Sequence, residues 1–142
     1  MPVRALVLSA AVALAACDGP SPFSEARVYA RDLVEAQTGT PALTPADCAA
    51  AQPDPGFFIN CWQTLVLCPS GDAELMLTDI VERGRYVVDG RAVRFDRDGG
   101  GTVHFSLSPG GREAERVGTG ERWVRWSPAD ERAVGALGVC RS

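Results

Sequence analysis

The stretch RAVRFDRDGGGTVHFSLS (residues 91–108) decides the fold class. Apolar and polar side chains alternate on both sides of its glycine run, as in Val93-Arg94-Phe95 and Val103-His104-Phe105. A period of two puts apolar residues on one face of a strand and polar residues on the other, and Asp98–Gly101 is typical of a hairpin turn. This stretch predicts two antiparallel strands with one buried and one solvated face.

Similar short segments lie on both sides of this hairpin and are separated by turns rich in Gly, Pro and Asp. The segments predicted as strands are residues 59–68, 73–80, 85–88, 91–97, 102–108, 113–117 and 122–127. We expect a mainly β protein, an antiparallel meander of about seven short strands that forms a small barrel or a curved sheet.

Helices are predicted before and after the meander. Apolar residues recur at helical spacing over Ser24–Gln37, which predicts an N-terminal helix. Thr44 and Pro45 are typical of a capped helix start and predict a short helix over 44–51. The same signals at Ser127-Pro128 predict a short C-terminal helix.

The N-terminus is typical of an exported protein. Residues 1–16 combine Arg4 with a short apolar run and small residues, which is the layout of a signal peptide. Leu14-Ala15-Ala16-Cys17 resembles the lipobox of bacterial lipoproteins, which implies that Cys17 is lipidated and becomes the new N-terminus. An ordinary signal peptide cut near Ala16 is the alternative. The predicted organisation is a signal peptide (1–16), a lipidated tether (17–23) and a single β domain (24–142).

The remaining four cysteines predict two disulfides in an oxidising compartment. Cys61 and Cys68 lie in one predicted strand, about 23 Å apart, so they cannot pair with each other. Cys48 and Cys140 must each pair with one of them. We favour Cys48–Cys61 and Cys68–Cys140, the shorter closures, and the crossed pairing stays open.

Composition excludes several classes of protein. The 142 residues include 46% hydrophobic and 23% charged residues, which excludes collagens, coiled coils and fully disordered chains. The formal net charge of −4 argues against nucleic acid as a partner.

No residue pattern predicts catalysis, a metal or a cofactor. The cysteine spacings match no zinc pattern, no CxxC pair is present, and His104 is the single histidine. We expect His104 on the polar face of its strand, and no nucleophile motif accompanies it. The sequence therefore predicts a protein that is not an enzyme.

Aromatic and arginine residues near the C-terminus are the predicted binding surface. Trp123 and Trp126 are three apart in a predicted strand and therefore point to opposite faces. Arg122 and Arg125 lie beside them, and guanidinium groups stack on indole rings. We expect these four residues to contact a partner.

Part of the chain resembles the lipocalin-like small β-barrel lipoproteins. The resemblance rests on Thr64–Leu75, which contains a Pro-Ser-Gly turn, on Gly84–Phe95, which contains Gly-Arg-Tyr and Asp-Gly, and on Phe105-Ser106-Leu107. It implies a small antiparallel barrel. A related family of envelope-stress lipoproteins carries a CxxC that this chain lacks, so no copper or redox role is transferred.

These features together favour a membrane-anchored envelope protein that acts as a non-enzymatic binding or interaction module. Its expected contacts are a bacterial membrane, through lipidated Cys17, and a protein partner at the envelope. One alternative is a carrier or sensor of a small apolar ligand, whose cavity would be lined by Val93, Phe95, Val103, Phe105 and Leu107. Another is an inhibitor of a secreted hydrolase that acts through the Asp98–Gly101 loop.

Overall fold

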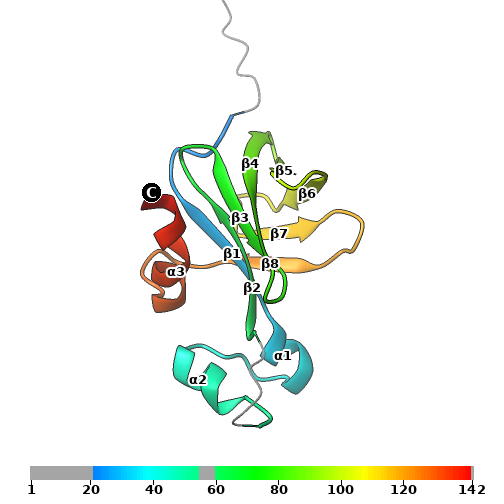
Figure 1. Ribbon diagram of the computed structural model, residues 1–142. Coiled ribbons are helices and arrows are strands. Elements are labelled where there is room, and N and C mark those ends of the chain that lie inside the picture. Colours follow the sequence, from blue (N-terminus) through cyan, green and yellow to red (C-terminus); the bar gives the residue numbers. More distant parts are fainter. Residues whose placement is uncertain (1–20, 55–59, 142) are drawn as a thin grey trace, which may run out of the picture.

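The computed structural model describes residues 21–54 and 60–141, and in these residues the chain forms a closed antiparallel barrel of eight strands (Figure 1). Each strand pairs with its neighbour in the sequence, and β8 pairs with β1 to close the barrel. The strands are β1 (Arg27–Asp32), β2 (Trp62–Leu67), β3 (Asp72–Met76), β4 (Val81–Asp89), β5 (Ala92–Arg97), β6 (Thr102–Leu107), β7 (Glu113–Arg116) and β8 (Arg122–Arg125). The predicted mainly β meander is confirmed, and all seven predicted strands are present as β2 to β8.

The eighth strand, β1, corrects the prediction of an N-terminal helix over Ser24–Gln37. Residues Arg27–Asp32 pair with all six residues of β2, and only Leu33–Thr38 form a helix, α1. The apolar spacing of this segment fits a helix locally, but as a strand it buries Tyr29 inside the barrel and Val28 on the outer face. Because closing the barrel also pairs the backbone of β1 with β8, tertiary context overrides local preference.

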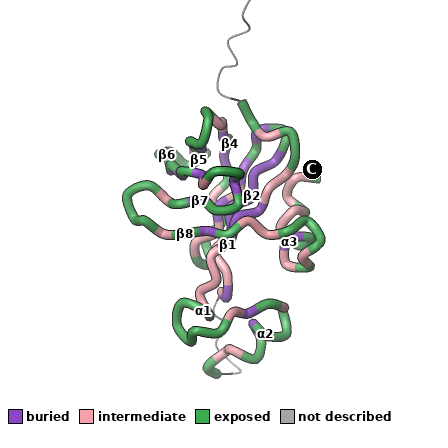
Figure 2. The backbone as a smooth tube through the Cα atoms, turned by 180° about the vertical axis from the view of Figure 1, so that it is seen from behind, coloured by how far each residue is buried: buried purple, intermediate pink, exposed green. Residues whose placement is uncertain are grey.

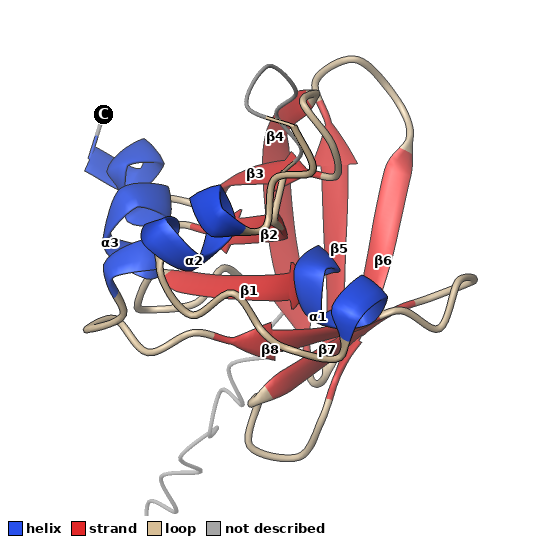
Figure 3. Ribbon diagram, turned by 90° about the horizontal axis from the view of Figure 1, so that it is seen from below, coloured by secondary structure: helices blue, strands red, loops and turns tan. Residues whose placement is uncertain are grey.

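The helices are short and lie outside the barrel. α1 begins where the Asp32 carboxylate accepts a hydrogen bond from the Glu35 N–H at 2.9 Å. α2 (Pro45–Ala50) has the predicted Thr44 cap. The C-terminal helix α3 (Glu131–Ala136) continues into the 3₁₀ turn η1 (Leu137–Arg141), and it is capped by Asp130, so Pro128 precedes the helix. α3 and α2 lie on the same flank of the barrel (Figure 3).

The barrel interior is filled by side chains. Buried residues follow the strands, whereas α1 and α2 are largely exposed (Figure 2). Trp123 and Phe105 pack edge to face with ring centroids 5.7 Å apart, and Tyr29 and Tyr86 are buried in the same core. The hydroxyl of Tyr86 donates to the Cys68 carbonyl at 2.9 Å, and burial raises the pKa of this side chain. A small closed barrel with this packing is consistent with the lipocalin-like resemblance.

The two ends of the barrel differ in what they carry. In an up-and-down barrel, alternate connections lie at the same end. One end, which we call the near mouth, holds the N-terminal segment and the β2–β3, β4–β5 and β6–β7 turns. The other end, the far mouth, holds α1, α2 and the β3–β4, β5–β6 and β7–β8 turns. The described chain enters at one end of the molecule and α1 and α2 lie at the opposite end (Figure 1).

The segment after the predicted anchor is fixed on the near mouth. Ser21 exchanges two backbone hydrogen bonds with Val88, and the Phe23 N–H donates to the Tyr86 hydroxyl at 2.9 Å. The Phe23 ring packs against the core and lies 3.7 Å from the Arg27 guanidinium. Residues 21–23, which the sequence places in the tether, therefore lie on the barrel. The predicted signal peptide and Cys17 lie outside the described residues.

Candidate functional site

The four residues predicted to bind a partner do not form one surface. Trp123 is fully buried in the barrel core, so its predicted contact with a partner is wrong. Trp126 points to the opposite face, as the spacing predicts, and lies half-buried outside the barrel. Arg125 donates to the Glu25 carboxylate at 2.7 Å near the N-terminal segment. Two tryptophans three residues apart point to opposite faces of the sheet, so one of them points into the barrel. That residue is Trp123.

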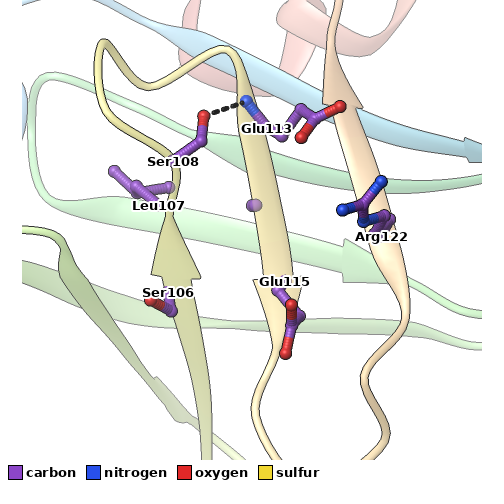
Figure 4. Close-up of a pocket in the computed structure, with 7 residues that line it drawn as sticks. Ser106, Leu107, Ser108, Glu113, Glu115 and Arg122 are labelled. Atoms are coloured by element: carbon purple, nitrogen blue, oxygen red, sulfur yellow. Dashed lines mark hydrogen bonds between the residues drawn. The ribbon is translucent and has the colours of Figure 1, made fainter.

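Arg122 lies in a shallow depression on the outer face of β6, β7 and β8 (Figure 4). It stands opposite Glu115 in the β7–β8 register, and Glu113 lies on the same face two residues away. The depression has a volume of about 210 Å³. Ser106, Glu113, Glu115 and Arg122 are exposed on one regular sheet surface, which is the usual state of the polar face of a sheet.

A larger hollow surrounds Trp126, between the outer face of β2–β3 and the C-terminal helix. We call it the tryptophan groove, and its volume is about 590 Å³. It is lined by Pro45, Trp62, Thr64, Val66, Glu74, Met76, Arg83, Trp126, Glu131, Arg132, Gly135, Ala136, Gly138 and Val139.

Alternation along β2 explains the sheet side of the groove. Leu65 and Leu67 point into the barrel, so Trp62, Thr64 and Val66 point outward. The indole rings of Trp62 and Trp126 meet edge to face, with centroids 5.8 Å apart. Both rings are only partly buried, so the groove presents aromatic surface to solvent.

The helix side of the groove presents glycine. A Cβ atom built on Gly135 or Gly138 would meet no heavy atom within 4 Å, so both positions face open space. Backbone without side chains lets another chain approach closely. The groove therefore has aromatic side chains on one side and, on the helix side, two glycine positions where the backbone is open to solvent.

Two disulfides hold the groove in shape. Cys68–Cys140 joins the end of β2 to η1, and Cys48–Cys61 joins α2 to the residue before Trp62. The favoured pairing is therefore confirmed. Such bonds are typical of proteins from an oxidising compartment outside the cytoplasm. Because each bond crosslinks one border of the groove to β2, its walls are pre-organised for binding.

The α1–α2 segment and α3, which border the groove, also meet at one backbone carbonyl. The Ala42 carbonyl accepts from the Trp62 indole N–H at 3.1 Å and from the Arg132 guanidinium at 2.8 Å. Ala42 itself is buried beside the Cys48–Cys61 bond. These contacts connect the α1–α2 segment, β2 and α3 at one point.

Arg132 places a positive charge in the groove, and the Asp130 carboxylate balances it. Its guanidinium contacts the Asp130 carboxylate at 2.6 Å and lies 4.4 Å from the Trp126 ring centroid. The hydrogen bond from Arg132 holds the pKa of Asp130 below its usual value and raises the pKa of Arg132. Arg83 is similarly paired with Glu74 at 3.1 Å. The charged side chains that line the groove are therefore largely paired already, and the surface that the groove offers to a ligand is mainly apolar.

The described residues that line the groove form no grouping typical of an active site. His104 lies on the exposed polar face of β6, as predicted, and away from the lining residues. Among residues 21–54 and 60–141, no three His, Cys, Asp or Glu side chains gather as metal ligands would. What the groove can do chemically is bury an apolar side chain against two indole rings.

The binding surface predicted from the sequence did not include Trp62 or Arg132. The signal for Trp62 was present, because alternation through Leu65 and Leu67 places it on the outer face with Val66. Arg132 had no such signal, since its contact with the Ala42 carbonyl depends on how α3 folds back on the barrel.

Comparisons of this chain with protein-family models, with curated proteins and with solved structures give no match. Within the part of the chain that the structure describes, no helix has the length and hydropathy needed to cross a membrane.

Proposed function

We propose that this protein is an exported, lipid-anchored binding module that holds an apolar segment of a protein partner in the tryptophan groove and catalyses no reaction. The observation that carries the proposal is the groove itself, where two partly exposed tryptophans meet edge to face and both disulfides crosslink a bordering element to β2. Tryptophan is enriched among the residues that dominate protein–protein binding energy.

A protein segment fits this groove better than a sugar does. Glycan binding needs polar groups free to bond to hydroxyls, but Arg132 and Glu74 are occupied by Asp130 and Arg83. The partly exposed Met76 and the two indole rings instead favour an aliphatic or proline side chain. Burying such a side chain contributes about 25 cal/mol per Å² of apolar surface.

Affinity capture of the lipidated protein from its native envelope tests the groove. We expect one protein partner to be captured by the wild type, lost with Trp126→Ala and retained with Arg122→Ala. Arg122 serves as the control because it is exposed on the barrel surface outside the groove. Far-UV circular dichroism must first show that both variants fold. Capture of the same partner by Trp126→Ala would contradict the proposal.

The anchor is tested separately through Cys17. If Cys17 is lipidated, Cys17→Ser should abolish acyl labelling and release the protein from membranes. A Cys17→Ser variant that still fractionates with membranes would show that another feature anchors the protein.

A carrier of a small apolar ligand receives less support. The five residues expected to line its cavity are all buried and pack in one core cluster with Trp123 and Tyr86. The interior of a small barrel packed in this way is occupied by its own side chains. The interaction module therefore remains the function that the geometry favours.

A further inference from the structure

We propose that the far mouth of the barrel is a second docking surface, which takes a protein partner bearing arginine or lysine around an exposed apolar side chain. This surface is distinct from the tryptophan groove. Its formation does not depend on the predicted lipid anchor.

The charge of the connections differs sharply between the two ends of the barrel. The described far-mouth connections, residues 33–54, 60–61, 77–80, 98–101 and 117–121, contain six acidic residues and no arginine or lysine. The near-mouth connections, residues 21–26, 68–71, 90–91 and 108–112, contain two arginines and one acidic residue. The C-terminal segment lies on the flank of the barrel, where Arg132 bonds to the Ala42 carbonyl. The six acidic residues are Glu35, Asp47, Asp54, Asp79, Asp98 and Glu121.

The acidic end also exposes large apolar side chains. Ile80 is 65% exposed, and Leu43 and Val117 are each 59% exposed, one in each of three far-mouth connections. Each of the three connections therefore offers a partner an apolar side chain whose surface is still open to burial.

A hollow of about 500 Å³ lies beside Ile80 at this end. It is formed between the α1–α2 segment and the β3–β4 turn, and it is lined by Leu33, Gln37, Pro53, Asn60, Leu77, Thr78 and Asp79. Leu33, Pro53 and Leu77 make part of its surface apolar, and Asp79 places a carboxylate at its edge. The hollow therefore offers an apolar contact with an acidic border.

Charge complementarity identifies the kind of partner. Carboxylates around an apolar contact attract a basic surface, speed its association and repel anionic alternatives. Nucleic acids and anionic membranes are both disfavoured, because each would place negative charge against this end of the barrel. A cationic protein surface is the remaining occupant that satisfies both the charge and the apolar contact.

The tether would present this surface away from the membrane if Cys17 is lipidated as proposed above. Only Asp18, Gly19 and Pro20 separate Cys17 from Ser21, which is bonded to the near mouth. Three residues reach about 10 Å. The near mouth would then face the lipid and the far mouth would face outward.

Calorimetric titration of the full chain carrying Cys17→Ser, with a short synthetic peptide of arginine and leucine as the probe, tests the docking surface without the anchor. The first variant, Glu35→Gln/Asp79→Asn/Asp98→Asn, removes three far-mouth carboxylates. Its matched control, Asp72→Asn/Asp89→Asn/Glu113→Gln, removes three exposed carboxylates at strand ends of the near mouth. Of these six side chains only Asp72 forms an ion pair within the described residues, with the exposed Arg85.

We expect the far-mouth variant to bind the peptide about tenfold more weakly and the control less than twofold more weakly, since each exposed charge contributes modestly. Ile80→Ser should also weaken binding, including at high salt where charge attraction is screened. Equal losses in the two triple variants would overturn the proposal, as would no loss in either. Loss of peptide binding in Trp126→Ala would also overturn it, by moving the contact to the tryptophan groove.

Discussion

The two disulfides should contribute unequally to stability, and the difference follows from the lengths of chain that they close. Cys48–Cys61 spans 13 residues and Cys68–Cys140 spans 72. Loop closure in the unfolded chain costs more entropy for longer loops, which gives about 3 kcal/mol for the first bond and about 4.4 kcal/mol for the second. Removing Cys68–Cys140 should therefore cost about 1.5 kcal/mol more.

The assay is guanidinium unfolding of two double variants, Cys48→Ala/Cys61→Ala and Cys68→Ala/Cys140→Ala, each with Cys17→Ser. The variants are matched chemically, because each replaces one disulfide with two alanines and both carry the same Cys17→Ser change. Tryptophan fluorescence and far-UV circular dichroism should report the same transition if unfolding is two-state. The free energy of unfolding is then obtained from the midpoint and the slope.

The reasoning is refuted if the Cys48–Cys61 variant loses as much stability as the Cys68–Cys140 variant, or more. A second measurement, capture of the partner, separates the shape of the tryptophan groove from the stability of the barrel. Loss of Cys68–Cys140 frees η1 from β2, so the partner captured by the tryptophan groove should be lost even where the barrel remains folded.

Three further predictions concern single residues. Trp123→Ala should lower the free energy of unfolding by about 4 kcal/mol, because the side chain is fully buried in the barrel core; a loss below about 1 kcal/mol in urea unfolding would contradict that packing. Asp130→Asn should flatten the loss of stability in acid. The Arg132 hydrogen bond depresses the pKa of Asp130, so its contribution is complete above the unfolded pKa of about 3.9 and disappears as the pH falls through the lower folded pKa. If the free energy of unfolding of Asp130→Asn falls in acid as steeply as that of the wild type, Asp130 does not contribute in this way. Gly84→Ala should cost about 3 kcal/mol, because its Cβ would clash with the Asp96 carbonyl oxygen on β5; a wild-type thermal midpoint would show that β5 can move aside.

Much of the fold could be predicted because strand patterns are local. Alternation at Val93-Arg94-Phe95 and the turn at Asp98–Gly101 depend only on neighbouring residues, and the structure has β5 and β6 there. The disulfide pairing could also be favoured from the sequence, since a strand keeps Cys61 and Cys68 apart whatever surrounds it. The lipobox prediction at Cys17 rests on sequence alone and stays a prediction.

Tertiary structure decided what local patterns leave open. Arg27–Asp32 has apolar spacing that suits a helix, but barrel closure makes it a strand, because the gap between β2 and β8 offers it two hydrogen-bonding neighbours. Likewise, the spacing of Trp123 and Trp126 predicts opposite faces, but only the closed barrel determines which face is the interior. The tryptophan groove depends on contacts between residues far apart in the chain, such as that of Arg132 with Ala42. Local sequence determines the period and direction of side chains, whereas a site built from distant segments exists only once burial and closure have brought them together.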